Sequence, residues 1–331
     1  MRKSRWLLLI LNFLAGAFLV SFGNGVSANA KTIKITFPKH VVAKHPATIN
    51  TVNFGKTVGV LSDGVINVKV YPGEQLYKTN QGLRFLTQGT VQMMNPPNGH
   101  FASYSPLFEL IEVPFVFKTN VDFYSFLYGK TGEKLLRSLQ KSNMHGITFA
   151  DEGPFVIATK NRLINSPSDF KGLKIRTSGH PVVEKALQLL GASTTRISLG
   201  EVYSAAQQGV INGVFTTITA YVNRHPYEVL PYATLWPGHA AYVWVASKSW
   251  WDGLNPFYRH LIDTTAKESA LKYDHQVWSI KDKYVNIIKK HGGKYHELSA
   301  SQLDKIHAKI KPLYSDLKKK FGAKIIDEMM R

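Results

Sequence analysis

The sequence of 331 residues contains no cysteine. This absence excludes disulfides, thiolate catalysis, cysteine-ligated zinc and a lipid anchor attached through a cysteine. After residues 6–20 no long apolar run follows, and a membrane-spanning helix needs roughly 20 such residues. Acidic residues are also few, because 22 Asp and Glu face 41 Lys and Arg, which gives a formal net charge of +19.

An excess of positive charge can indicate attraction to nucleic acid or to anionic membranes. Here the lysines are scattered, residues 318–320 form the only tight run, and no nucleic-acid-binding motif is present. We therefore interpret the charge as a solvated surface that also attracts anionic solutes, and we expect no nucleic-acid partner.

Catalytic motifs are missing as well. The sequence has no Gly-x-Ser-x-Gly elbow, no His-Glu-x-x-His and no phosphate-binding glycine loop. Its 12 histidines do not recur at the spacing of metal ligands. We therefore expect no catalytic residues, no cofactor and no metal site, and nothing in the sequence supports a metal that bridges a bound molecule and the protein.

Residues 1–30 have the pattern of a secretory signal peptide. A head with Arg2, Lys3 and Arg5 precedes the apolar run at 6–20, and Ala-Asn-Ala at 28–30 is a typical cleavage site. An uncleaved membrane anchor is the alternative, but the apolar run is short for it. We expect a mature chain of net charge +16, without these three cations, that diffuses freely in the periplasm of a Gram-negative bacterium.

The stretch 169–217 alternates strands and helices. Strands are predicted at 173–176, 193–199 and 210–217, with helices at 181–190 and 202–208 between them. This order is typical of an α/β layer, in which ligands bind at the ends of strands.

Arg176 stands at the end of the first of these strands and before the next helix. A guanidinium binds a carboxylate through two parallel hydrogen bonds, and a helix N-terminus adds free N–H groups and positive potential. This is a site for an anion. For a lone arginine the ordinary alternative is an exposed or salt-bridged side chain, and the local pattern leaves that alternative open.

Four motifs of this region occur in a specific order: Gly-Leu-Lys-Ile-Arg at 172–176, Leu-Gly-Ala at 190–192, Gly-Glu-Val-Tyr at 200–203 and Gln-Gln-Gly-Val-Ile-Asn-Gly at 207–213. They resemble the DctP-type extracytoplasmic solute receptors of TRAP transporters. The resemblance extends over nearly all of the mature chain. In that family the arginine of the first motif holds a carboxylate of the solute, which implies this role for Arg176.

The resemblance also implies the fold and the partners. The fold is α/β, a two-lobed periplasmic binding protein with hinge strands and a long helix spanning both lobes, and the lobes close over one solute. The expected partners are a small carboxylate and the small and large membrane subunits of an ion-gradient-driven transporter. The resemblance thus predicts a binding protein and not an enzyme. Because receptors for ATP-driven importers share the lobed architecture, that class remains the nearest alternative. A periplasmic enzyme acting on organic acids is the alternative of a different class.

We assign 31–153 plus about 242–280 to lobe I, and 154–241 plus about 281–331 to lobe II. The remaining elements follow from periodicity and turn residues. Strands are predicted at 32–37, 65–71, 89–94, 146–150 and 242–247, and helices at 45–61, 80–87, 122–141 with a break near 129–132, 255–290, 301–311 and 316–330.

Further ligand contacts are predicted at strand ends. Asn95 and Asn98 follow the strand at 89–94 in a Pro-rich loop, where they serve either the ligand or the shape of the loop. Phe155 stands where many relatives of the TRAP type have a second arginine, which implies a solute with one carboxylate and a flatter or less charged remainder. Thr216 stands where several relatives place a solute-contacting Asn.

Four more residues complete the predicted ligand-binding set. Ser178 and Phe215 adjoin the positions already named. Trp236 and His239 belong to a segment that we interpret as a loop between two strands, near the return crossing between the lobes. The alternative for each aromatic residue is an ordinary place in the core.

Overall fold

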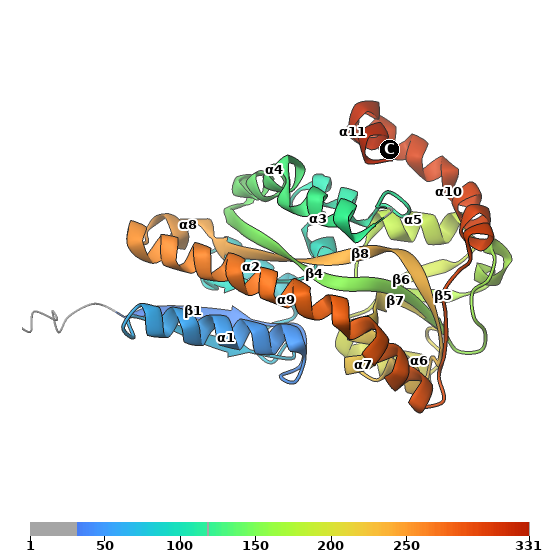
Figure 1. Cartoon of the computed structure of the whole chain (residues 1–331), viewed down its shortest axis with the longest axis horizontal. Coiled ribbons are helices and arrows are strands. Elements are labelled where there is room, and N and C mark those ends of the chain that lie inside the picture. The colour runs from blue at the N-terminus through green and yellow to red at the C-terminus, as the bar shows by residue number, and fades with distance from the viewer. Residues whose placement is uncertain (1–31, 118, 331) are drawn as a thin grey trace, which may run out of the picture. The chain divides into compact units, whose positions relative to one another are not determined.

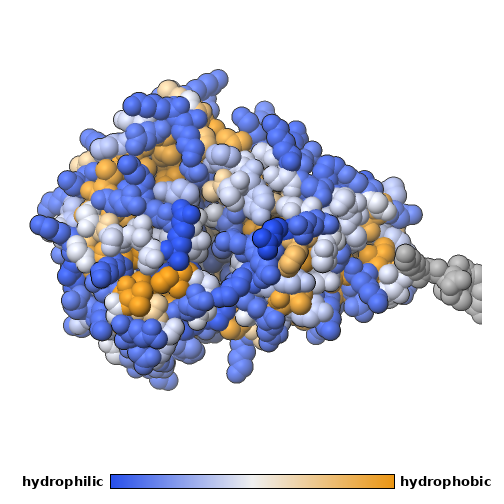
Figure 2. Space-filling view, turned by 180° about the vertical axis from the view of Figure 1, so that it is seen from behind, coloured by the Kyte–Doolittle hydropathy of each residue, from blue (hydrophilic) through white to orange (hydrophobic). Residues whose placement is uncertain are grey.

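A computed structural model describes residues 32–117 and 119–330, except for the side chain of Trp278. The predicted signal peptide at 1–30 lies outside the described residues. Within the described part of the chain, every helix is too short or too polar to span a bilayer. Hydrophilic side chains cover most of the face in Figure 2, with apolar residues in small patches among them.

Two long antiparallel strands form the centre of the molecule (Figure 1). They are β4 (Met144–Thr159) and β8 (Tyr232–Ser247), which pair along their whole length. At roughly 3.3 Å per residue each strand extends over about 50 Å. The sheet has the order β3-β8-β4-β7-β5-β6, and β9 (Lys294–His296) pairs with β8.

One end of this strand pair belongs to the first lobe. There β3 (Met93–Met94) pairs with β8, and a separate parallel pair is formed by β1 (Ile33–Pro38) and β2 (Ile66–Tyr71). Helix α1 (Pro46–Leu61) connects these two strands, as the βαβ pattern of the sequence predicts. The apolar side chains of β1, α1 and β8 share one core, in which Trp244 packs edge-on against Phe37 and Phe54.

The other end belongs to the second lobe. β7 (Gly213–Thr217) pairs antiparallel with β4, while β5 (Lys174–Thr177) lies parallel between β7 and β6 (Ser193–Arg196). Helices α5 (Pro181–Leu189) and α6 (Val202–Gln207) connect these strands. The strand–helix alternation predicted for 169–217 is confirmed, although β6 and β7 are shorter than predicted.

The helix α9 (Pro256–Lys290) runs alongside β4 and contributes to both lobes (Figure 1). Ile262, Ala266 and Tyr273 enter the core of the first lobe, and Tyr284 and Ile288 enter that of the second. The long helix spanning both lobes is thus confirmed. The assignment of residues to lobes I and II stays a prediction.

Shorter elements complete the described chain. The α-helices are α2 (Thr79–Thr87), α3 (Asn120–Tyr128), α4 (Lys130–Ser138), α7 (Ile218–Asn223), α8 (Lys248–Asp252), α10 (Ala300–Phe321) and α11 (Ala323–Met329). The 3₁₀ helices are Asn98–Phe101, Pro106–Glu112, Leu139–Ser142, Pro167–Phe170, Leu199–Glu201 and Pro226–Glu228.

Two predicted elements are wrong, and each error has a structural cause. The segment 236–239 is not a loop but part of β8, where a shift in register opposite Pro154 and Phe155 accommodates Pro237 and Gly238. Of the strand predicted at 89–94, only Met93–Met94 is extended, because Gly89 adopts a φ of 83° and ends α2 in a turn.

The two predicted C-terminal helices also differ from the structure. α10 continues through Pro312, and the break falls at Gly322. A proline inside a helix removes one backbone hydrogen bond, but the buried face of α10 continues on both sides of it through Ile306, Ile310 and Leu313. These residues pack against the core that α5 shares, which offsets the local loss.

Trp244→Ala is predicted to lower the free energy of unfolding by about 4 kcal/mol, because it removes a fully buried indole from the core of the first lobe. Urea unfolding of the mature protein measures the effect. Val60→Ala is the matched control, since Val60 is 75% exposed and its truncation should change stability by less than about 0.5 kcal/mol. Equal effects of the two substitutions would contradict the assigned core.

Candidate functional site

A cavity of about 670 Å³ lies between loops of the two lobes. Most of its wall follows the carboxyl ends of strands: His40 comes after β1, Glu74 after β2, Gly99 after β3, Ser178 after β5 and Ile197 after β6. Ligands of open α/β sheets bind at this edge. The wall also contains Lys78, Thr79, Asn80, Pro97, His100, Ala102, Ser103, Tyr104, Glu109, Glu152, Arg176, Gly179, Pro181, Arg196, Ser198, Leu199, Thr216 and Ala220.

Arg176 on β5 is the buried cation of this wall. Its side chain is 2% exposed, and its Nε donates a hydrogen bond to the carbonyl oxygen of Ile197 at 2.7 Å. No carboxylate in the described part of the chain forms an ion pair with the guanidinium. Arg176 is therefore neither exposed nor salt-bridged within the described residues, which excludes the ordinary alternative for a lone arginine.

The guanidinium keeps its charge in this position. Burial lowers the pKa of Arg176 to about 10, and the negative charges of Glu74, Glu152 and Glu201 oppose that effect. The group is thus cationic at neutral pH. A buried cation without a paired anion is costly, so this arrangement favours an anion inside the cavity.

The N-terminus of α5 adjoins the same cavity. Ser178, Gly179 and Pro181 line the wall, and the N-cap His180 gives no side-chain hydrogen bond to the helix. The positive end of the helix dipole therefore adds to the potential around Arg176.

Glu152 on β4 is a second buried ionisable group of the wall. Its Oε1 accepts a hydrogen bond from the hydroxyl of Thr217 at 3.2 Å, whereas Oε2 is buried without a partner among the described residues. Burial raises the pKa of Glu152 to about 7, although His180, Thr217 and Lys39 act in the opposite direction.

The two histidines of the wall are neutral at physiological pH. Burial lowers the pKa of His100 to about 3, and burial together with the charge of Lys39 holds the pKa of His40 well below its usual value. His100 Nδ1 lies 2.7 Å from the side-chain oxygen of Asn80. These imidazoles are therefore polar hydrogen-bonding groups of the cavity rather than cations.

Several contacts join the lobes around the cavity. Lys78 beside α2 pairs with Glu201 at 2.6 Å, and Arg224 donates to the carbonyl oxygen of His40 at 2.8 Å. The Lys78 and Glu201 side chains are more than half exposed, so this ion pair contributes little on its own. A ligand that contacts both lobes would add to these interactions.

Of the predicted ligand-binding residues, the structure brings Arg176, Ser178 and Thr216 together in the wall. Asn95 and Asn98 lie outside it, and both make hydrogen bonds within the protein. Asn95 accepts from Lys39 at 2.6 Å, and Asn98 donates to Glu112 at 2.6 Å while accepting from the backbone of Ala241.

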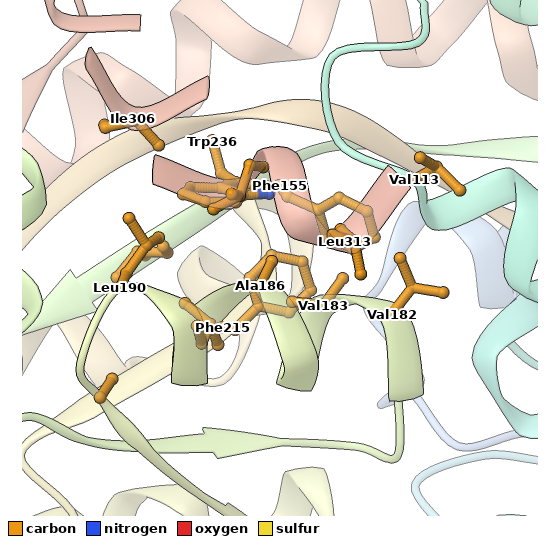
Figure 3. Packing of buried hydrophobic residues seen from close by; sticks show 14 of the residues in the cluster. Val113, Phe155, Val182, Val183, Ala186, Leu190, Phe215, Trp236, Ile306 and Leu313 are labelled. Carbon is orange, nitrogen blue, oxygen red and sulfur yellow. The ribbon is translucent and has the colours of Figure 1, made fainter. Parts of the chain in front are cut away.

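Phe155, Phe215 and Trp236 also lie outside the cavity wall. Figure 3 shows them packed among residues of α5 and α10 in the core of the second lobe. Phe215 and Thr216 are consecutive on β7, so their side chains point to opposite faces of the sheet. His239 lies elsewhere, 3.3 Å from Asp151 and against Phe123.

Sequence reasoning missed Glu152, Glu74 and the segment 196–199. One signal for Glu152 was available, because two adjacent carboxylates, Asp151 and Glu152, interrupt the mostly apolar run of β4 at the predicted crossover. No comparable signal marks Glu74, whose Oε1 caps the start of α2 by accepting from Thr79 N and Oγ1.

The chain is similar to known solute-binding proteins along most of its length. Residues 37–320 match the model of the family described as bacterial extracellular solute-binding protein, family 7. The C4-dicarboxylate-binding periplasmic protein DctP of Rhodobacter capsulatus is 30% identical over 323 residues, which cover 96% of this chain and 96% of that protein.

Solved structures agree with the fold. A TRAP periplasmic solute-binding protein of Sulfurospirillum deleyianum with bound succinate has a TM-score of 0.85 and 24% identity, covering 90% of this chain and 98% of that one. The sugar acid binding protein DctPAm of Advenella mimigardefordensis with galactonate has a TM-score of 0.86 and 24% identity, covering 91% and 98%.

The two lobes and the cavity between them define a solute receptor, and the chain belongs to the DctP family of extracellular solute-binding proteins. The resemblance to the receptors of TRAP transporters is thereby confirmed. The family consists of solute-binding receptors, not enzymes.

Glu152→Gln is predicted to raise the free energy of unfolding of the ligand-free protein above that of the wild type, and to do so more at pH 8 than at pH 5. A carboxyl group whose pKa is raised by folding binds more protons in the folded state, so its contribution to stability is lost as pH rises from about 4.5 to about 7. The whole change is on the order of 3 kcal/mol. Unfolding of both proteins at several pH values measures the difference.

Glu184→Gln supplies a control with the opposite sign. Burial raises the pKa of Glu184, but the hydrogen bonds from Arg196 and Thr177 lower it by more, so its stabilising contribution is lost as pH falls. The stability difference between wild type and Glu184→Gln should therefore grow as pH rises. If the free energies of unfolding of wild type and Glu152→Gln changed in parallel with pH, the raised pKa of Glu152 would be refuted.

Proposed function

We propose that this protein captures a small organic acid by closing its lobes around it, with the guanidinium of Arg176 holding the carboxylate. The observation that carries the proposal is a buried, cationic arginine in the wall of an interlobe cavity, with no anionic partner among the residues that the structure describes. A carboxylate accepts two parallel hydrogen bonds from a guanidinium, which fixes its orientation as well as its charge.

The size and composition of the cavity support a small solute. Its volume of about 670 Å³ falls within the range of sites for small molecules. Ser178 and Thr216 offer hydroxyl groups near Arg176, and His40 and His100 offer neutral imidazoles. A solute that contacts both walls stabilises the closed form and shifts the population toward it.

Relatives give independent support. Solved structures of TRAP solute-binding proteins carry succinate, D-glucuronate and L-malate, and the sugar acid binding protein DctPAm carries galactonate. All four ligands contain a carboxylate. By this analogy the closed receptor delivers its solute to the small and large membrane subunits of an ion-gradient-driven TRAP transporter. It acts in the periplasm after removal of residues 1–30, without a cofactor and without a nucleic-acid partner.

Arg176→Ala is predicted to abolish measurable binding of carboxylates, a loss of at least about 100-fold in affinity, because the buried charge and both hydrogen bonds are removed. Arg176→Lys should recover only part of the affinity, since an ammonium keeps the charge but not the paired geometry. Isothermal titration against a panel of mono- and dicarboxylates, sugar acids and amino acids measures both variants.

Arg137→Ala is the matched control, because Arg137 pairs with Glu133 on the exposed face of α4. Its affinities should equal those of the wild type. Carboxylate binding that survives Arg176→Ala with unchanged affinity would place the anion site elsewhere and contradict the proposal.

A further inference from the structure

One carboxylate oxygen of Glu152 has no hydrogen-bond donor among the described residues, and Arg176 in the same cavity wall has no anionic partner among them. The carboxyl group is 5% exposed, belongs to the cavity wall, and has one oxygen bonded to Thr217 and the other unpartnered within the described residues. Arg176 belongs to the same wall, so the two groups line one cavity.

The basic side chains near Glu152 are engaged elsewhere. Lys39 donates to Asn95 at 2.6 Å and lies 4.4 Å from the ring centre of Tyr242. His180 is bonded at both ring nitrogens, to Glu112 at 2.5 Å and to Ser178 at 2.6 Å. Neither forms an ion pair with Glu152 in the part of the chain that the structure describes.

The unpartnered oxygen of Glu152 affects how the site binds the part of the solute that Arg176 does not hold. A plain alkyl carboxylate would satisfy the guanidinium and leave the oxygen of Glu152, which is already buried, without a donor. A buried polar group without a partner costs about 1–3 kcal/mol, more when it is charged. A solute that places a donor there avoids this cost.

We propose that Glu152 selects solutes that carry, besides the carboxylate, a hydrogen-bond donor, either a hydroxyl or an ammonium group, and that it discriminates against alkyl carboxylates of the same length. The inference rests on the proposed function of Arg176. Sites built to bond a ligand O–H or N–H reject analogues lacking it far more strongly than apolar pockets reject a missing methylene. Glu152 is thus a specificity-determining residue that touches the solute.

Three six-carbon probes test the inference by isothermal titration. Gluconate carries hydroxyls along its chain, 6-aminohexanoate carries an ammonium group, and hexanoate carries neither. Wild type should prefer gluconate or 6-aminohexanoate over hexanoate by at least about 100-fold. Which of the two binds identifies the donor as hydroxyl or ammonium.

Glu152→Gln should reduce that preference at least about tenfold, because the amide that retains the bond to Thr217 presents its NH₂ to the solute. Glu297→Gln is the matched control, because Glu297 lies outside the cavity wall and pairs with Lys281 at 2.9 Å. Its substitution should leave the preference unchanged.

The outcomes separate this inference from the one on which it rests. Equal affinity of wild type for hexanoate and gluconate, or equal weakening of all probes by Glu152→Gln, would overturn the role of Glu152 and leave that of Arg176 intact. Binding that is insensitive to Arg176→Ala would overturn the proposed function itself. Failure of all three probes to bind would count against both.

Discussion

The burial of Arg176 without a paired carboxylate among the described residues is the constraint on which the site depends. The guanidinium is 2% exposed, burial lowers its pKa to about 10, and Glu74, Glu152 and Glu201 oppose that effect although none of them bonds to it. The arrangement is unfavourable in isolation and favourable once an anion enters. We therefore attribute the proposed preference for an anionic solute to the missing ion pair of this side chain.

The paired strands β4 and β8 make that arrangement available. They extend through both lobes, so residues near their middle meet loops from each. Glu152 lies at this point on β4, next to a shift in register between Asp151 and Gly153, and Arg176 reaches the same cavity from β5. Since α9 packs along β4 and enters both cores, it braces the crossing strands from behind.

Much of this could be predicted from sequence, and the exceptions have physical causes. Period-two alternation, glycine stops and the position of Arg176 at a strand end are local signals, and the structure confirms the elements they predict. Whether Phe155 or Trp236 faces a cavity or a core depends on bulges and on pairing between β4 and β8, which local patterns do not encode. The same holds for Pro312, tolerated because α10 packs against distant residues.

The most direct test of the central claim is a crystal structure of the receptor purified from the periplasm with its solute retained. The account predicts a carboxylate bound to two nitrogens of Arg176 at about 2.8 Å, inside the cavity and in contact with both lobes. A solute anion held by other residues, with Arg176 paired to a carboxylate of the protein itself, would contradict it.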